Sequence, residues 1–82
     1  MDKILVTIYV LSIEQEFDVF LPIGETVSNV LDLIQDSLVD LSNNNYIKKE
    51  NVFLYDNEGN IINPNNIIKY SGLKNGEKVC LM

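Results

Sequence analysis

The sequence predicts a small α+β domain in which a mixed sheet of four or five strands packs on one helix. Three observations carry this prediction: two alternating apolar segments open the chain, one amphipathic segment follows, and short apolar segments separated by turns close it. One apolar helix face can be buried by one sheet. A chain of 82 residues is expected to form a single domain, residues 1–82.

The first two segments have the two-residue period of strands. Residues 3–11 are rich in β-branched and aromatic side chains, and their even-numbered apolar members share one face. In residues 16–21, Phe17, Val19 and Leu21 point one way. Because the link between the segments is short, an antiparallel hairpin is the economical connection.

The amphipathic segment, residues 26–42, predicts the helix. Thr26 can cap it, because the hydroxyl can accept a hydrogen bond from a backbone N–H of the first turn. Apolar residues recur at helical spacing and form one stripe. The stripe consists of Val27, Val30, Leu31, Ile34, Leu38 and Leu41. The asparagines at 43–45 suit the left-handed conformation that ends many helices.

Turn residues divide the second half into short segments. Residues 52–56 predict a third strand, residues 57–60 a turn and residues 61–62 a brief return strand. Residues 67–73 predict a compact loop or a short helical turn.

A closing strand is predicted at residues 78–82, after the tight-turn dipeptide Asn75–Gly76. We expect this strand beside the first one, in parallel, which gives a mixed sheet curled around the helix.

The sheet has a second face, which is the leading candidate for binding. We expect the inner face to carry Phe17, Val19, Leu21, Phe53, Val79 and Leu81. The outer face then exposes Phe20, Leu54, Cys80 and Met82, with Leu5 and Tyr9 as further members. An exposed apolar face of this size is typical of a protein-binding surface, and a homodimer is one way to cover it. In the alternative, the strand at residues 52–56 is shifted by one residue, which exchanges its faces.

The amino-acid composition limits the classes of partner and the cellular compartment that we expect. The chain has twelve Asp and Glu residues, six Lys and no Arg, which gives a formal charge of −6. This charge argues against nucleic acid and anionic membranes, so the expected partners are proteins, with no direct membrane insertion. One cysteine allows no internal disulfide, and the apolar run at residues 4–11 is too short to span a bilayer. A cytoplasmic protein is expected.

No residue pattern predicts catalysis. The chain has no His, and Cys80 has no candidate base beside it, although Lys78 shares its face. The turn at residues 56–60 carries acids and amides but lacks the spacing of a calcium loop. We therefore expect no enzyme activity, no cofactor and no metal site.

Asp32, Asp36 and Asp40 form an acidic ridge on the helix, opposite the apolar stripe. Such a row is usually a solvated face. The functional alternative is a docking ridge for a basic partner.

The order of the segments and three motifs carry a family resemblance. TVSNVLDLI, FLYDNEGNII and IIKYSGLKNGEKVCLM resemble the helix opening, the third strand with its turn, and the closing segment of ubiquitin-like proteins. The resemblance implies the β-grasp fold, order ββαβ(β)β. With its short length, Y-D-x-x-G turn and S-G-L-x-N-G-E-K motif, the chain is most similar to the small bacterial branch typified by YukD and EsaB.

That branch is associated with type VII (WXG100) secretion in Gram-positive bacteria, so the resemblance implies an accessory or adaptor protein. Secretion-system membrane components are among the implied partners. In ubiquitin the main recognition patch lies on the third and last strands, which here matches Leu54, Cys80 and Met82. Conjugated relatives use a C-terminal Gly pair, and Leu81 and Met82 stand at this position, so we expect a non-conjugated protein.

Two alternatives remain open. A chain that continues beyond Met82 could be a ubiquitin-like modifier or a sulfur carrier. A β-grasp domain can also be a non-catalytic subunit of a larger enzyme complex.

Overall fold

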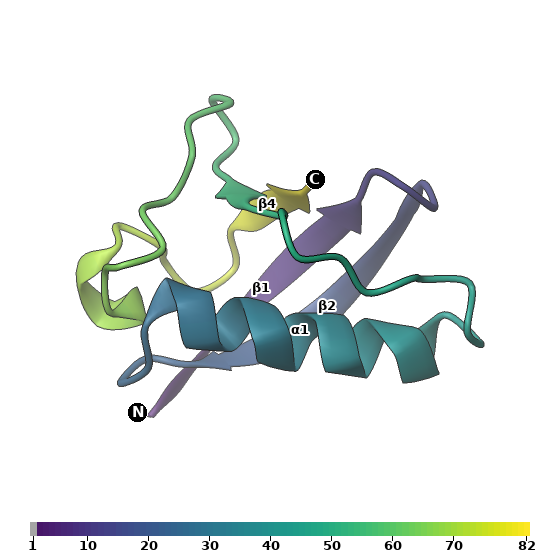
Figure 1. Cartoon of the computed structure of the whole chain (residues 1–82). Helices are drawn as coiled ribbons and strands as arrows, with labels where there is room; N and C mark the ends of the chain where they lie inside the picture. Colours follow the sequence, from purple (N-terminus) through teal and green to yellow (C-terminus); the bar gives the residue numbers. More distant parts are fainter. Residues whose placement is uncertain (1) are drawn as a thin grey trace.

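The computed structural model describes residues 2–82, and Figure 1 shows the helix lying across one face of a twisted sheet. The elements in chain order are β1 (Lys3–Val10), β2 (Gln15–Pro22), α1 (Val27–Leu41), β3 (Leu54–Tyr55), the short 3-10 helix η1 (Ile68–Tyr70) and β4 (Lys78–Leu81). The predicted α+β class is confirmed. Within residues 2–82, no helix has the length and apolar character needed to cross a membrane.

The sheet is mixed and has the strand order β2-β1-β4-β3. β1 pairs antiparallel with β2 and parallel with β4, and β3 pairs antiparallel with β4. The first and last strands therefore lie side by side at the centre, as the sequence predicted, and β2 and β3 form the two edges.

The tight turn before β4 fixes the start of the parallel pair. Gly76 adopts φ 89°, a conformation that side-chain-bearing residues rarely reach, and its N–H donates to the Leu5 carbonyl at 2.6 Å. The Leu5 N–H in turn donates to the Asn75 side-chain oxygen at 2.7 Å. The Asn75–Gly76 dipeptide thus sets both the turn and the register of β4 against β1.

α1 begins as predicted, because the Thr26 hydroxyl accepts from the Asn29 N–H at 3.2 Å. Its buried face carries Val27, Val30, Leu31, Ile34, Gln35 and Leu38. Leu41 was wrongly placed in this stripe, since 53% of it is exposed in the last helical turn. Ser42, 4% exposed, continues the buried face instead, one turn after Leu38.

A buried glutamine joins α1 to the crossover, residues 43–53, which leads to β3. Gln35 is 2% exposed. Its side-chain oxygen accepts from the Lys49 N–H at 2.8 Å and from the Tyr46 hydroxyl at 2.6 Å, and its amide donates to the Lys49 carbonyl at 3.0 Å. The crossover lacks strand partners here, so one side chain satisfies the backbone groups that a neighbouring strand would otherwise bond.

The third strand corrects the predicted faces. Leu54 is fully buried and Phe53 is 36% exposed, so Leu54 belongs to the core and Phe53 to the outer side. Leu54 lies opposite the buried Leu81, and residues directly opposite in a sheet share a face. The prediction was wrong because residues 52–55 are all apolar, so their alternation carries no information about the face.

The third strand is also shorter than predicted, and the return strand is absent. β3 covers Leu54–Tyr55 alone, and residues 61–62 contribute a single bridge between Tyr55 and Ile61. The connecting turn is closed by the Asp56 carboxylate, which accepts from the N–H groups of Glu58 and Asn60, both at 2.9 Å.

The reversed faces of β3 give a paired mutational test. Leu54→Ala should lower the free energy of unfolding by about 3 kcal/mol, because it opens a cavity in a packed core. Phe53→Ala removes a larger but partly exposed side chain, and should lower the free energy of unfolding by less. Urea unfolding of the two variants, followed by circular dichroism, measures both values. If Phe53→Ala lowered the free energy of unfolding more than Leu54→Ala, Phe53 would belong to the core and the faces of β3 would be as the sequence predicted.

The role of Gln35 can be measured with two further variants. Gln35→Leu leaves the Lys49 backbone groups and the Tyr46 hydroxyl without their partner, and should cost about 2–3 kcal/mol. Tyr46→Phe removes only one hydroxyl from the same network and should cost about 1 kcal/mol. Equal losses in urea unfolding would mean that the Lys49 hydrogen bonds contribute little.

Candidate protein-interaction site on the outer sheet face

The strand register defines the face of the sheet that α1 leaves uncovered. Cys80 of β4 lies between Tyr9 of β1 and Tyr55 of β3, its partners on either side. Tyr9 in turn lies opposite Glu16 of β2. The Phe53 and Met82 backbones exchange two hydrogen bonds, at 3.0 and 3.2 Å, which continues the β3–β4 pairing beyond Leu54. Met82 therefore shares the outer face with Cys80.

A shallow groove of about 450 Å³ lies on this face. We call it the outer-face groove, and its lining residues are Tyr9, Glu16, Tyr55, Asp56, Asn57, Gly59, Lys78, Val79, Cys80 and Met82. Two aromatic rings, a thiol and a thioether are among its non-polar lining groups. Clustered aromatic and Met side chains at an accessible face are the composition that protein interfaces favour.

The structure brings some predicted site residues together and separates others. Cys80 and Met82 line the outer-face groove, and Met82 is 46% exposed. Leu54 was wrongly placed on this face, and Tyr55 takes the position expected of it. Phe20 does point outward and is 65% exposed, but its partner on β1 is Leu5.

Phe20 is therefore remote from the groove. Leu5 and Tyr9 are four residues apart on β1, which corresponds to about 13 Å along a strand. Polar pairs occupy the interval: the Lys78 ammonium contacts the Glu16 carboxylate at 2.7 Å. The predicted patch is thus two apolar areas, one at Cys80 and one at Phe20, separated by a polar belt.

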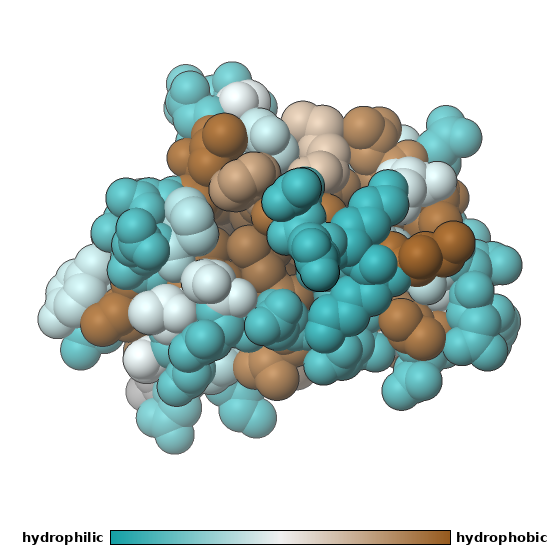
Figure 2. Space-filling view, viewed as in Figure 1, coloured by the Kyte–Doolittle hydropathy of each residue, from teal (hydrophilic) through white to brown (hydrophobic). Residues whose placement is uncertain are grey.

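The polar belt continues on β1 and β2, where the Thr7 hydroxyl donates to Asp18 at 2.7 Å. Above the second apolar area, the Lys3 ammonium lies 5.9 Å from the centre of the Phe20 ring. Figure 2 shows the opposite side of the molecule, where hydrophilic residues predominate over α1 and the crossover.

The rim of the groove is charged. Backbone hydrogen bonds, from Asn60 above all, hold the pKa of Asp56 below its usual value, so this carboxylate stays ionised at neutral pH. On the other side, the hydrogen bond to Glu16 and the charge of that carboxylate raise the pKa of Lys78. The groove thus combines an apolar floor with fixed charges, an arrangement that suits a peptide or protein surface.

Cys80 has the environment of a structural thiol. Its partial burial raises the pKa of the thiol, which lowers the fraction of reactive thiolate at neutral pH. Lys78, the cation that the sequence placed on the same face, is held by Glu16. Within residues 2–82, no group of three or more potential metal ligands comes together.

The acidic ridge, Asp32, Asp36 and Asp40, lies on the exposed side of α1. The Lys48 ammonium, on the crossover, donates a hydrogen bond to the Asp36 carboxylate at 2.9 Å, and this hydrogen bond raises the pKa of Lys48. One member of the ridge thus helps to attach the crossover to the helix.

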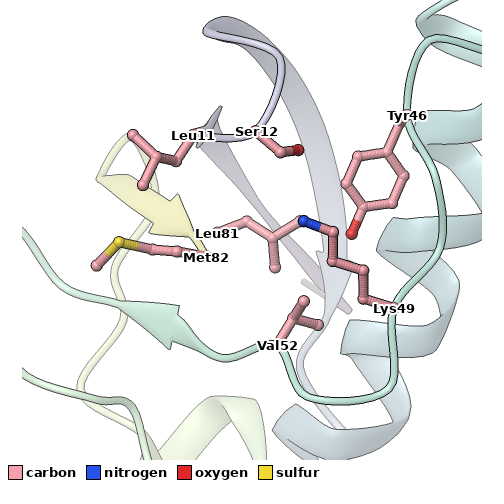
Figure 3. Close-up of a pocket in the computed structure, with 7 residues that line it drawn as sticks. All are labelled: Leu11, Ser12, Tyr46, Lys49, Val52, Leu81 and Met82. Carbon is pink, nitrogen blue, oxygen red and sulfur yellow. The ribbon is translucent and has the colours of Figure 1, made fainter.

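A second, smaller pocket of about 180 Å³ lies where the crossover meets the β1–β2 hairpin and the end of β4. Figure 3 shows the Lys49 side chain extending across it towards Leu81, with the Tyr46 ring on one side. The Tyr46 hydroxyl is already used by Gln35, and burial raises its pKa. This pocket is smaller than the outer-face groove.

Comparison with known proteins shows the fold. No protein-family model matches the chain, and no curated protein matches it. Among solved structures, the ubiquitin-like domain of the Mycobacterium tuberculosis type VII secretion system protein EccD1 matches with a TM-score of 0.77 and 13% identity, over 100% of this chain and 99% of that chain.

Two further structures are of complexes. A chain in a MycP5-free ESX-5 inner membrane complex matches with a TM-score of 0.73 and 12% identity, over 100% of this chain and 21% of that chain. A chain in a toluene 4-monooxygenase HD complex matches with a TM-score of 0.79 and 14% identity, over 96% of this chain and 95% of that chain. At such identities the likeness concerns the fold alone, and the chain therefore has the ubiquitin-like β-grasp fold.

Proposed function

We propose that this chain is a ubiquitin-like protein-interaction module that acts in the cytoplasm as an accessory or adaptor of a type VII (WXG100) secretion system. It binds its partner through the outer-face groove. It does no chemistry of its own and needs no cofactor.

The outer-face groove is the observation that carries the binding role. It places two tyrosines around Cys80, with Met82 at one end. Aromatic side chains that bury a large area dominate the energetics of many interfaces. The charged rim, with Asp56 on one side and the Glu16–Lys78 pair on the other, gives the contact a preferred orientation.

The secretion role is supported by the likeness to the EccD1 domain and by the closing motif of the sequence. The membrane components of such an apparatus are the partners we propose first. Because fold alone does not determine function, this step needs its own experiment.

A second candidate is a non-catalytic subunit of a larger enzyme complex. The likeness to a chain of the toluene 4-monooxygenase complex, which this chain covers almost completely, favours it. The same outer-face groove would then contact an enzyme subunit.

The binding role predicts the effect of removing the groove. The double variant Tyr55→Ala, Met82→Asp should weaken partner binding by about thirtyfold or more, the loss typical of interface hot spots. Purified protein with an affinity tag, used to capture partners from the source cells, identifies the partner by mass spectrometry. Titration of the variant against that partner then measures the loss.

The matched control is Ile47→Asp. Ile47 is 75% exposed on the crossover, away from the sheet face, so the same apolar-to-acid change should leave binding intact. Circular dichroism of each variant checks that the fold is retained. Equal binding by the groove variant and the control would place the contact elsewhere.

The secretion role predicts a change in the culture medium. With the gene deleted in frame, small helical-hairpin proteins of the WXG100 kind should disappear from the medium while their cellular levels hold. The wild-type gene should restore them, and the groove variant should not. An unchanged medium, with the secretion system running, would rule out the secretion role. Co-purification with a metalloenzyme would then favour the second candidate.

A further inference from the structure

The outer-face groove has two acidic residues on its rim, and only one of them is paired with a lysine. Glu16 binds the Lys78 ammonium at 2.7 Å. Asp56 lies at the other end of the groove, and within residues 2–82 no lysine forms an ion pair with it. This end of the groove therefore carries a negative charge without a basic partner, in a chain whose formal charge is −6.

The Asp56 carboxylate is held in place by the turn that follows β3. Its Oδ1 atom accepts hydrogen bonds from the N–H groups of Glu58 and Asn60, both at 2.9 Å, and neither bond uses the second oxygen, Oδ2. The backbone hydrogen bonds also hold the pKa of Asp56 below its usual value, so the group is ionised at neutral pH. A carboxylate fixed in this way can pair with a cation at a lower entropic cost than a mobile one.

An aromatic side chain stands next to this carboxylate. Tyr55 directly precedes Asp56, and both residues line the outer-face groove. Cys80 lies beside Tyr55 on the neighbouring strand, and Tyr9 lies on the far side of Cys80. Adjacent strands are about 4.8 Å apart, so the backbones of the two tyrosines are separated by about 10 Å. The middle of the groove is thus a small side chain between two large aromatic ones.

The lysines of this protein lie over other aromatic rings. One lysine lies over Phe20 and another over Tyr70. In the part of the chain that the structure describes, no lysine lies over the Tyr55 ring in this way. Lys78 lines the groove, but its ammonium is held by Glu16. An aromatic ring and an ionised carboxylate are therefore side by side and open to a cation from another molecule.

This combination of groups favours arginine among the side chains that a partner can offer. A guanidinium is planar, stacks on aromatic faces and carries a fork of N–H donors that matches a carboxylate. An apolar side chain would contact Tyr55 but would leave the charge of Asp56 unpaired in the interface, which is unfavourable. A second copy of this chain cannot supply the group, because the chain has no Arg.

We propose that the outer-face groove binds an arginine of the partner, whose guanidinium stacks on Tyr55 and donates hydrogen bonds to the Asp56 carboxylate. An apolar side chain next to that arginine packs on Met82, which continues the outer face beyond Cys80 and is 46% exposed. This inference rests on the proposed function, because it gives the chemistry of the partner segment that enters the same groove.

A matched pair of peptides tests the proposal: acetyl-Leu-Arg-Leu-amide, and the same peptide with citrulline in place of arginine. Citrulline has nearly the shape of arginine and no charge. Each peptide is titrated to millimolar concentration into the whole, ¹⁵N-labelled protein. The arginine peptide should give saturable amide shifts at Tyr55, Asp56 and Cys80. The citrulline peptide should bind about tenfold more weakly or less, because the charge-assisted hydrogen bonds are lost.

Two variants assign the preference for arginine to its two proposed contacts. Asp56→Asn keeps an oxygen that can accept from the turn and removes the charge, so the two peptides should bind to this variant with about equal affinity. Tyr55→Leu keeps an apolar side chain and removes the ring, and should weaken binding of the arginine peptide by about threefold or more.

The matched control is Asp2→Asn. Asp2 is exposed just before β1 and does not line the groove, so the same chemical change should keep the full preference for arginine. Raising the salt concentration should weaken the arginine peptide more than the citrulline peptide. The amide spectrum of each variant checks that the fold is retained.

Three results would overturn the proposal: no saturable shifts with the arginine peptide, equal binding of both peptides to the wild-type protein, or a preference for arginine that survives Asp56→Asn. Equal binding with shifts at Tyr55 and Cys80 would leave the groove as an apolar docking site, so the proposed function would stand without the arginine. The proposed function itself fails on a different measurement, which is undiminished partner binding by the double variant Tyr55→Ala, Met82→Asp.

Discussion

The burial of one face of α1 is the constraint on which the rest of the structure depends. Six residues of the helix are buried, and a chain of 82 residues has one sheet with which to cover them. The strand order β2-β1-β4-β3 achieves this by placing β1, whose Val6, Ile8 and Val10 are almost fully buried, beside β4 at the centre. Within residues 2–82 no helix covers the opposite face of the sheet, and it is there that the molecule presents Tyr9, Tyr55, a thiol and a thioether.

Polar interactions also shape the structure, in the crossover and on the outer face of the sheet. The crossover is held partly by the buried Tyr46 and Val52. Gln35 adds three hydrogen bonds to Tyr46 and to the Lys49 backbone, where no strand lies beside the chain. On the outer face, the Glu16–Lys78 pair spans from β2 to β4 and divides the apolar surface in two. The binding surface is therefore defined as much by a polar belt as by the hydrophobic residues on either side of it.

Much of the fold could be predicted from the sequence, because strong local signals agreed with the global arrangement. The cap at Thr26, the alternation in β2 and the Asn75–Gly76 turn each specify one local structure. Prediction failed where the local signal was degenerate. Four consecutive apolar residues at 52–55 fit either face, and the Leu81 partner that decides between them is distant in sequence. The separation of Phe20 from Cys80 likewise depends on register and on a long-range ion pair, neither of which is visible in a strand pattern.

The central position of β4 has a consequence for how the protein is made. β1 has its parallel partner in residues 78–81, and β2, α1, β3 and η1 all lie between these two central strands in the sequence. Closing such a long loop costs entropy before any contact repays it, which slows folding relative to a helical domain of the same size. During synthesis the β1–β2 hairpin and α1 can form early, but one long side of β1 stays unpaired until residues 78–81 have been added. Until then the nascent chain carries an open strand edge, which β4 covers in the finished fold.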